Sequence, residues 1–174
     1  MPLAINFYPE SDLEDFAPSV SEYERIWNED GERIIRALES HAGLQFRETV
    51  INAVVGDGIS HSHPLFLRYS LSSADKRVTL VHELGHRLLY KRVPGMGTVS
   101  SLGHHKYLFL ILGDVLGALY GKEYLAQTIA RDNALAPKYK EAWAWANAFT
   151  ETERQARFQR ILAGNLTLLD LSEE

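Results

Sequence analysis

The chain contains no cysteine among its 174 residues, and this absence limits how it can fold. No disulfide can cross-link the structure, so the fold must rest on a hydrophobic core. A chain of this length can bury such a core within a single domain. The absence also removes thiolate ligands, so any bound metal must be held by histidine, aspartate or glutamate.

The composition is that of an ordinary soluble globular protein, with 45% hydrophobic and 24% charged residues and a formal net charge of -5. No block of lysine or arginine occurs, so we expect no nucleic-acid partner. The longest apolar stretch, residues 107–120, contains Asp114 and is too short to span a bilayer, so we expect no membrane partner. Residues 1–10 lack a secretory signal, and we therefore expect a cytoplasmic protein.

Hydrophobic periodicity predicts the order of the secondary-structure elements: a helix, a small sheet and then a run of helices. This order predicts an α+β fold in which a small β-sheet with an edge strand packs on a predominantly helical domain spanning residues 1–174. Residues 1–20 are rich in turns and acidic side chains, which indicates a mobile N-terminal arm. The predicted elements are helices over residues 21–41, 72–91, 104–120, 122–134, 138–149 and 150–163, and strands over residues 46–55 and 64–70.

Several local signals refine these elements. Gly31 interrupts the first helical pattern and could divide that helix in two. Pro64 cannot donate a ladder hydrogen bond, so the second strand is expected at a sheet edge. Thr150 and Glu153 form a capping-box pattern for the last helix. The glycine-rich loop over residues 93–103 is expected to border a cleft.

The sequence His82-Glu83-Leu84-Gly85-His86 lies in the most strongly predicted helix. His82 and His86 are four residues apart, which places them on one face and about 6 Å apart along the axis. Both neutral imidazoles can therefore reach one ion, and Zn²⁺ accepts such ligands. Glu83 lies about 100° round from His82, where it can act as general base towards a water. Gly85 costs about 1 kcal/mol of helix stability relative to alanine, which suits a close approach by another element.

The segment from Val81 to Leu89 (VHELGHRLL) resembles the active-site helix of the zincin metallopeptidases, the HExxH superfamily. The resemblance implies that His82 and His86 bind zinc and that Glu83 is the general base. It also implies a hydrolase that cuts peptide bonds in a peptide or protein substrate with a water activated by the metal. A strand over residues 65–69, just before the helix, would hold an extended substrate by β-pairing.

The resemblance does not extend to a subgroup of zincins. Leu89 and Arg92 occupy the positions at which metzincins carry a glycine and the third histidine ligand. The Asn-Glu pattern of gluzincins and the Gly-Thr-x-x-Tyr-Asp pattern of aspzincins are absent as well. The subgroup therefore stays unassigned, and the third ligand must come from further along the chain.

Asp114 is the strongest candidate for the third ligand, because apolar residues surround it in the sequence. A buried carboxylate needs a metal or another partner. Gly113, Gly117 and Gly121 recur every four residues beside it, and this ridge would let the Gly85 face of the metal helix pack closely. Alternatively, Asp114 is bonded to an arginine, tyrosine or histidine side chain.

His105 is the second candidate, nine residues before Asp114. On a straight helix the two lie about 180° apart in azimuth and about 13.5 Å apart along the axis, so they cannot both bind one ion. His105 is then a metal ligand supported by Asp114, a catalytic donor to the transition state, or a solvent-facing residue. Glu123 is a weaker candidate and is best explained as exposed. His61 and His63 could hold a second metal, but a solvated loop is the simpler interpretation.

The sequence thus predicts a zinc-dependent peptidase with His82, His86 and Asp114 as metal ligands and with Glu83 and His105 as catalytic residues. One alternative is a non-catalytic zincin-like module that binds a metal or a partner. Another is a metal-dependent hydrolase of a non-peptide amide. The number of protein ligands separates these functions, because a closed four-ligand zinc site is structural and an open one is catalytic.

Overall fold

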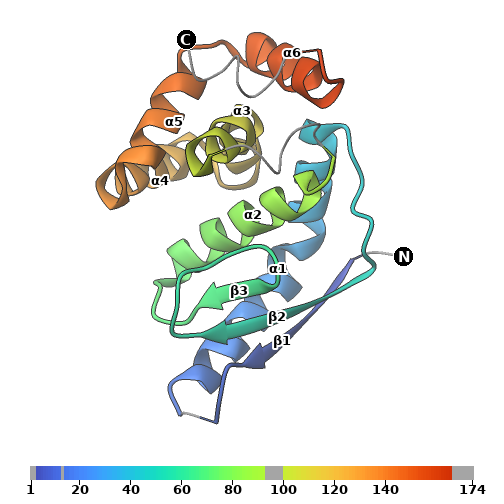
Figure 1. Cartoon of the computed structure of the whole chain (residues 1–174). Coiled ribbons are helices and arrows are strands. Elements are labelled where there is room, and N and C mark those ends of the chain that lie inside the picture. Colours follow the sequence, from blue (N-terminus) through green and yellow to red (C-terminus); the bar gives the residue numbers. More distant parts are fainter. Residues whose placement is uncertain (1–2, 13, 93–99, 166–174) are drawn as a thin grey trace. The chain divides into compact units, whose positions relative to one another are not determined.

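The computed structural model describes residues 3–12, 14–92 and 100–165 (Figure 1). Helices predominate and the strands form one small sheet, which confirms the predicted α+β fold. Backbone contacts divide the chain into two compact units, residues 1–39 with 44–88 and residues 40–43 with 89–174. The expectation of a single domain stays a prediction. The first unit contains β1 (Ala4–Pro9), β2 (Val50–Gly56) and β3 (Leu65–Arg68), together with α1 (Phe16–Ala42) and α2 (Ser73–Leu89) except for their last residues, 40–42 and 89.

The sheet of the first unit is parallel, with strand order β1-β2-β3. Its side chains alternate between a buried and an exposed face, as period-two strands require. α1 packs on the buried face, where Tyr23 stacks on Phe7 with a ring-centroid distance of 6.0 Å. The Tyr23 hydroxyl also donates a 3.0 Å hydrogen bond to the carbonyl oxygen of Arg68. The buried hydrophobic side chains of the sheet are those of Ile5, Phe7, Ile51, Ala53, Val55, Leu65 and Leu67.

The sequence predicts a mobile arm over residues 1–20, but the described residues of this range, 3–12 and 14–20, include two regular elements. Residues 4–9 form β1, and α1 begins at Phe16. Ile5 and Phe7 are buried and alternate with exposed neighbours, which is the pattern of a half-buried strand. The partner of β1 is β2, which lies more than 40 residues further along the chain. Turn-rich composition therefore misled the prediction, because the strand depends on a pairing that local composition does not report.

Helix α1 runs without a break through Gly31, where the sequence suggested an interruption. A Cβ atom at this position would lie 2.7 Å from Cδ2 of Trp27. The glycine therefore makes room for the indole ring one turn earlier and does not end the helix. The helix ends instead just before Gly43, which follows α1 with a positive φ of 65°.

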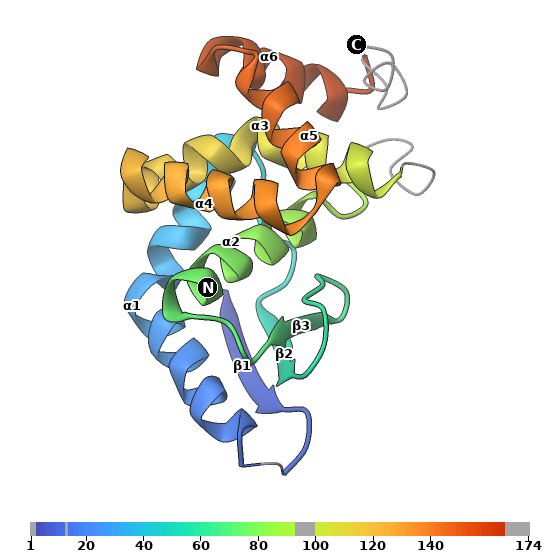
Figure 2. The ribbon, with the colours of Figure 1, turned by 90° about the vertical axis from the view of Figure 1, so that its left-hand side faces the viewer.

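The connection between β2 and β3 is short for two parallel strands, which usually need a crossover of a dozen or more residues. Residues 57–64 make this connection, and β3 has only 4 residues. The loop returns beside β3 and forms an antiparallel bridge between His61 and Phe66 (Figure 2). β3 pairs with β2 on its other side, so the edge position predicted from Pro64 is confirmed.

Helices make up the second unit, close to the predicted boundaries. The capping box of the last helix is confirmed, because the Thr150 backbone N–H donates to Glu153 Oε2 at 2.8 Å and Thr150 Oγ1 accepts from the Glu153 N–H. Of the predicted loop 93–103, residues 93–99 lie outside the described residues. Over the described ranges, no helix is long and apolar enough to cross a membrane. The helices are α3 (Ser101–Tyr120), α4 (Lys122–Leu135), α5 (Pro137–Asn147) and α6 (Glu151–Leu162).

Helix α3 is the core of this unit, and most of its residues are buried. Trp143 of α5 packs on it, with its ring 4.2 Å from the ring of Phe109. A Cβ at Gly113 would lie 3.4 Å from this indole, and a Cβ at Gly117 would lie 3.8 Å from Leu125 of α4. Gly113 and Gly117 of the predicted ridge thus accommodate side chains of α5 and α4, whereas the sequence assigned the ridge to the Gly85 face of the metal helix; a Cβ at Gly121 would meet nothing within 4 Å.

Candidate metal centre

The two predicted histidine ligands converge on one face of α2. The Nε2 atoms of His82 and His86 lie 3.1 Å apart, and their ring centroids lie 4.8 Å apart. Both side chains are half-buried. This convergence follows from the spacing of four residues in an uninterrupted helix, which brings successive turns into register.

The separation of the two nitrogens fits a shared zinc ion. Two nitrogen ligands at about 2.0–2.1 Å from a tetrahedral zinc lie about 3.3 Å from each other. The observed 3.1 Å is close to this value. The same distance also suits an N–H···N hydrogen bond between neutral imidazoles, which depends on their tautomers. The donor set therefore fits zinc, and zinc itself stays a prediction.

Glu83 is buried, with 8% of its surface exposed, although it lies next to half-buried His82. Its surroundings include Tyr23 of α1. Burial raises the pKa of the Tyr23 hydroxyl far above its usual value, and the charges of Glu22 and Glu83 add to this effect. The Glu83 carboxylate is thus close enough to the interior of the first unit to act on a buried tyrosine.

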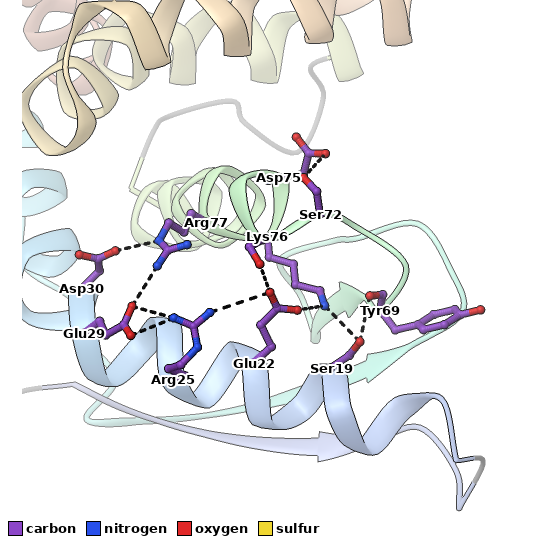
Figure 3. A network of polar contacts seen from close by, with 11 residues as sticks. Ser19, Glu22, Arg25, Glu29, Asp30, Tyr69, Ser72, Asp75, Lys76 and Arg77 are labelled. Atoms are coloured by element: carbon purple, nitrogen blue, oxygen red, sulfur yellow. Dashed lines mark hydrogen bonds and ion pairs between the residues drawn. The ribbon is translucent and has the colours of Figure 1, made fainter.

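Polar contacts hold α2 against α1 (Figure 3). The ammonium group of Lys76, whose side chain is only 4% exposed, forms an ion pair with Glu22 and donates to Ser19 Oγ at 3.1 Å. The next residue of α2 also reaches α1, because Arg77 Nε donates to Asp30 Oδ2 at 3.2 Å. Because two consecutive residues of α2 reach α1, the rotation of α2 about its own axis is restrained. The same restraint applies to the histidines that follow on this helix.

The charge of Glu22 is favoured by this arrangement. Burial by itself opposes ionisation of the carboxyl group, but hydrogen bonds from Lys76 and Ser73 outweigh it and lower the pKa of Glu22 overall. Glu22 and Lys76 therefore form an ion pair between α1 and α2.

Arg87, which directly follows His86, ties the end of α2 to the rest of the first unit. Its Nε donates to Glu48 Oε1 at 3.0 Å, and its NH1 group donates to the Ser62 carbonyl oxygen at 2.8 Å. The helix that carries the histidine pair is therefore bonded directly to the loop between β2 and β3.

His105 lies in α3 of the second unit and is buried, with 7% of its surface exposed. Its Nδ1 atom lies 2.5 Å from the Ser101 carbonyl oxygen, and its ring meets the ring of Tyr139 edge-on at 4.8 Å. A carbonyl only accepts hydrogen bonds, so Nδ1 carries the proton and Nε2 keeps its lone pair. Burial lowers the pKa of His105 to about 4, although the bond to Ser101 opposes this change. The imidazole is therefore neutral at pH 7, as a metal ligand must be.

Asp114 lies further along α3 and is paired with Arg154 of α6. The Nε atom of Arg154 donates to Asp114 Oδ2 at 3.2 Å, and its NH2 group donates to Asp114 Oδ1. This is the arginine pairing that the sequence analysis left open as an alternative. Sequence reasoning did not find Arg154, because it lies 40 residues away and no local pattern marks it.

The remaining candidates are exposed. Glu123 lies in the first turn of α4 and is exposed, as the sequence predicts. His61 and His63 are both exposed in the loop over residues 57–64, which confirms the interpretation as a solvated loop. The Nδ1 atom of His61 is hydrogen-bonded to the Pro64 carbonyl oxygen at 2.7 Å.

Comparison of the chain with known protein families, curated proteins and solved structures gave no match. The resemblance to zincins therefore rests on the motif of α2, and function must be argued from its residues.

Proposed function

We propose that the chain is a zinc-dependent peptidase in which His82, His86 and His105 hold the metal and Glu83 is the general base. The observation that carries this proposal is the 3.1 Å separation of the His82 and His86 Nε2 atoms on a restrained helix. These three histidines offer imidazole nitrogens that could hold a metal ion. Histidine nitrogens are common zinc ligands, and three protein ligands are usual at a catalytic zinc.

We prefer His105 to Asp114 as the third ligand because of their partners within the second unit. Arg154 donates to both carboxylate oxygens of Asp114, so a metal would have to compete with a charged donor. The Ser101 carbonyl fixes the tautomer of His105 instead, and such a contact is usual behind a zinc-binding histidine. The two residues also lie on opposite faces of an uninterrupted α3, so only one of them can be a ligand.

The division of labour in this site follows from the residue types. A bound zinc would lower the pKa of a water towards about 7 and polarise the scissile carbonyl. The Glu83 carboxylate would take a proton from the attacking water and deliver it to the leaving amine. The histidines would remain neutral, and in His105 the bond to Ser101 would hold the ring in position.

The first experiment replaces Glu83 by glutamine, which keeps the size of the side chain and removes its basicity. We expect zinc content to stay at one ion per chain while hydrolysis of fluorescein-labelled casein falls by about 10²–10⁴-fold. Glu24→Gln, an exposed position on α1, is the matched control and should keep full activity. Equal activity in the Glu83→Gln variant and the wild-type protein would remove the proposed base.

The second experiment identifies the third ligand by zinc affinity, measured by equilibrium dialysis and elemental analysis. His105→Ala should weaken zinc binding at least 100-fold, because one of three ligands is lost. Asp114→Asn on the same helix should leave it within threefold of the wild-type value. The reverse result would return the ligand role to Asp114.

A further inference from the structure

The outer edge of β3 is a row of backbone groups that point away from β2. In a strand, successive residues direct their N–H and C=O groups to opposite sides. Tyr69 donates to the Gly56 carbonyl oxygen of β2 at 3.0 Å, and Leu67 lies on the same side by this alternation. Phe66 and Arg68 therefore direct their backbone groups outward, where another extended chain could pair with them.

This outer edge already has an occupant from the same chain. The N–H of His61 donates to the Phe66 carbonyl oxygen at 3.0 Å, and the N–H of Phe66 donates to the His61 carbonyl oxygen at 2.9 Å. The Arg68 N–H donates to Ser60 Oγ at 2.9 Å. The rings of His61 and Phe66 are also stacked, with centroids 5.4 Å apart. We call residues 59–63 the edge strap; Figure 2 shows the loop that contains it beside β3.

The edge strap is held by polar contacts and not by a buried core. None of residues 57–64, all of which the structure describes, is buried, and Ile59 is 85% exposed. Displacing the strap would therefore disrupt no buried residue of its own, although it would end the stacking of His61 on Phe66. An extended peptide that replaced it could form the same antiparallel hydrogen bonds with β3. The free energy of exchanging the strap for the peptide would therefore be close to zero.

We propose that the edge strap is an intrachain competitor of extended peptide substrates, which must displace it from β3 before they are cut. The inference rests on the proposed function, because it concerns access of peptides to that site. It adds a competing segment to the expectation that a strand over residues 65–69 holds an extended substrate by β-pairing. Arg87 links the edge strap to the helix that carries the histidine pair. It follows His86 on α2 and donates to the Ser62 carbonyl oxygen within the strap. Displacement of the strap would break this bond.

A reversible lock tests the proposal in the full-length chain. Directly opposed residues of a hydrogen-bonded antiparallel pair have Cα atoms about 5.5 Å apart, which a disulfide can span. His61→Cys with Phe66→Cys places the only two thiols in the protein, because the chain has no cysteine of its own. Oxidation should lower casein hydrolysis by the zinc-loaded variant at least tenfold, and reduction should restore it. Equal rates in the oxidised and reduced forms would overturn the proposal.

A matched pair of serine variants tests whether a more weakly held strap raises the rate of hydrolysis. Ser60→Ala removes the hydrogen bond to the Arg68 N–H and should raise the rate of casein hydrolysis about three- to fivefold, the effect of one net hydrogen bond on an opening equilibrium. Ser62→Ala, two residues away, leaves every backbone contact of the strap in place and should change the rate less than twofold. A rate that is the same in both variants would contradict the proposal.

Hydrogen exchange separates failure of this inference from failure of the proposed function. In the Glu83→Gln variant, an excess of casein should speed exchange of the His61 amide at least tenfold, because displacement breaks its bond to Phe66. The Phe66 amide should stay protected, since the incoming peptide replaces its partner. Unchanged exchange of His61 would overturn the strap proposal, whereas absence of hydrolysis by the wild-type protein would overturn the peptidase function alone.

Discussion

Arg154 donates hydrogen bonds to both carboxylate oxygens of Asp114 and, through its NH1 group, to the Phe149 carbonyl oxygen at 2.8 Å. The two charged side chains are 16% and 12% exposed, so water screens them only weakly. This pairing joins α3 to α6 and explains, without any metal, how a carboxylate can lie in an apolar stretch of sequence.

Removal of this carboxylate should lower stability. Asp114→Ala leaves the Arg154 guanidinium with one backbone partner, and we expect a loss of about 2–3 kcal/mol in the free energy of unfolding, somewhat less than for a fully buried pair. Urea denaturation of the metal-free protein measures it. Arg154→Met in the same background should recover part of the loss, and strict additivity of the two substitutions would show that the pair is not coupled.

The Glu22–Lys76 pair should matter far more than an exposed ion pair on the same helix. Glu22→Ala leaves a nearly buried ammonium group without its carboxylate and should lower the free energy of unfolding by about 3 kcal/mol. Glu32→Ala removes the exposed partner of Arg36 and should cost less than about 1 kcal/mol. Comparable losses in urea denaturation of the two variants would refute the restraining role given to Lys76.

The buried imidazole of His105 should make stability depend on pH. Its pKa is lowered from 6.5 to about 4 by burial, so between these values the unfolded chain binds more protons than the folded one. The stabilisation is complete above pH 6.5 and is lost as pH falls towards 4. His105→Gln should remove this part of the dependence, so the wild-type protein should lose about 2 kcal/mol more than the variant between pH 7 and pH 4.5. Urea denaturation with a chelator present, carried out at both pH values, measures this loss for the wild-type protein and for the variant.

Zinc should stabilise the folded chain through His82 and His86. A ligand that binds only the folded state at a hundred times its dissociation constant adds about 2.7 kcal/mol, and a chelator should remove this gain. The melting temperature, followed by circular dichroism, should therefore rise with zinc in the wild-type protein and in the His63→Ala control. It should not change with zinc in His82→Ala. A zinc response in that variant would place the metal elsewhere.

Much of the fold follows from local patterns. The spacing of His82 and His86 and the capping box at Thr150 depend on residues within one helical turn, so the sequence predicts them well. The boundaries of the later helices are predicted for the same reason. Each of these features is decided by contacts between neighbours along the chain.

The features that sequence reasoning missed all depend on distant partners. β1 exists because it pairs with β2, and Asp114 is satisfied by an arginine 40 residues later. The occupied edge of β3 follows from the short connection between two parallel strands, whose direction cannot be read from their composition. The choice of the third ligand also depends on distant neighbours: the sequence ranks Asp114 before His105, and our preference for His105 comes from the Asp114–Arg154 pairing.

The one-sided burial of the parallel sheet has a consequence for how this protein can diverge. Parallel sheets are usually covered on both faces, yet Asn6, Tyr8 and Asn52 of this sheet are exposed. Substitutions at these positions leave the core intact, whereas changes at Ile5 or Phe7 open cavities in it. Over evolutionary time, tolerated variation in the first strand should therefore alternate from one residue to the next.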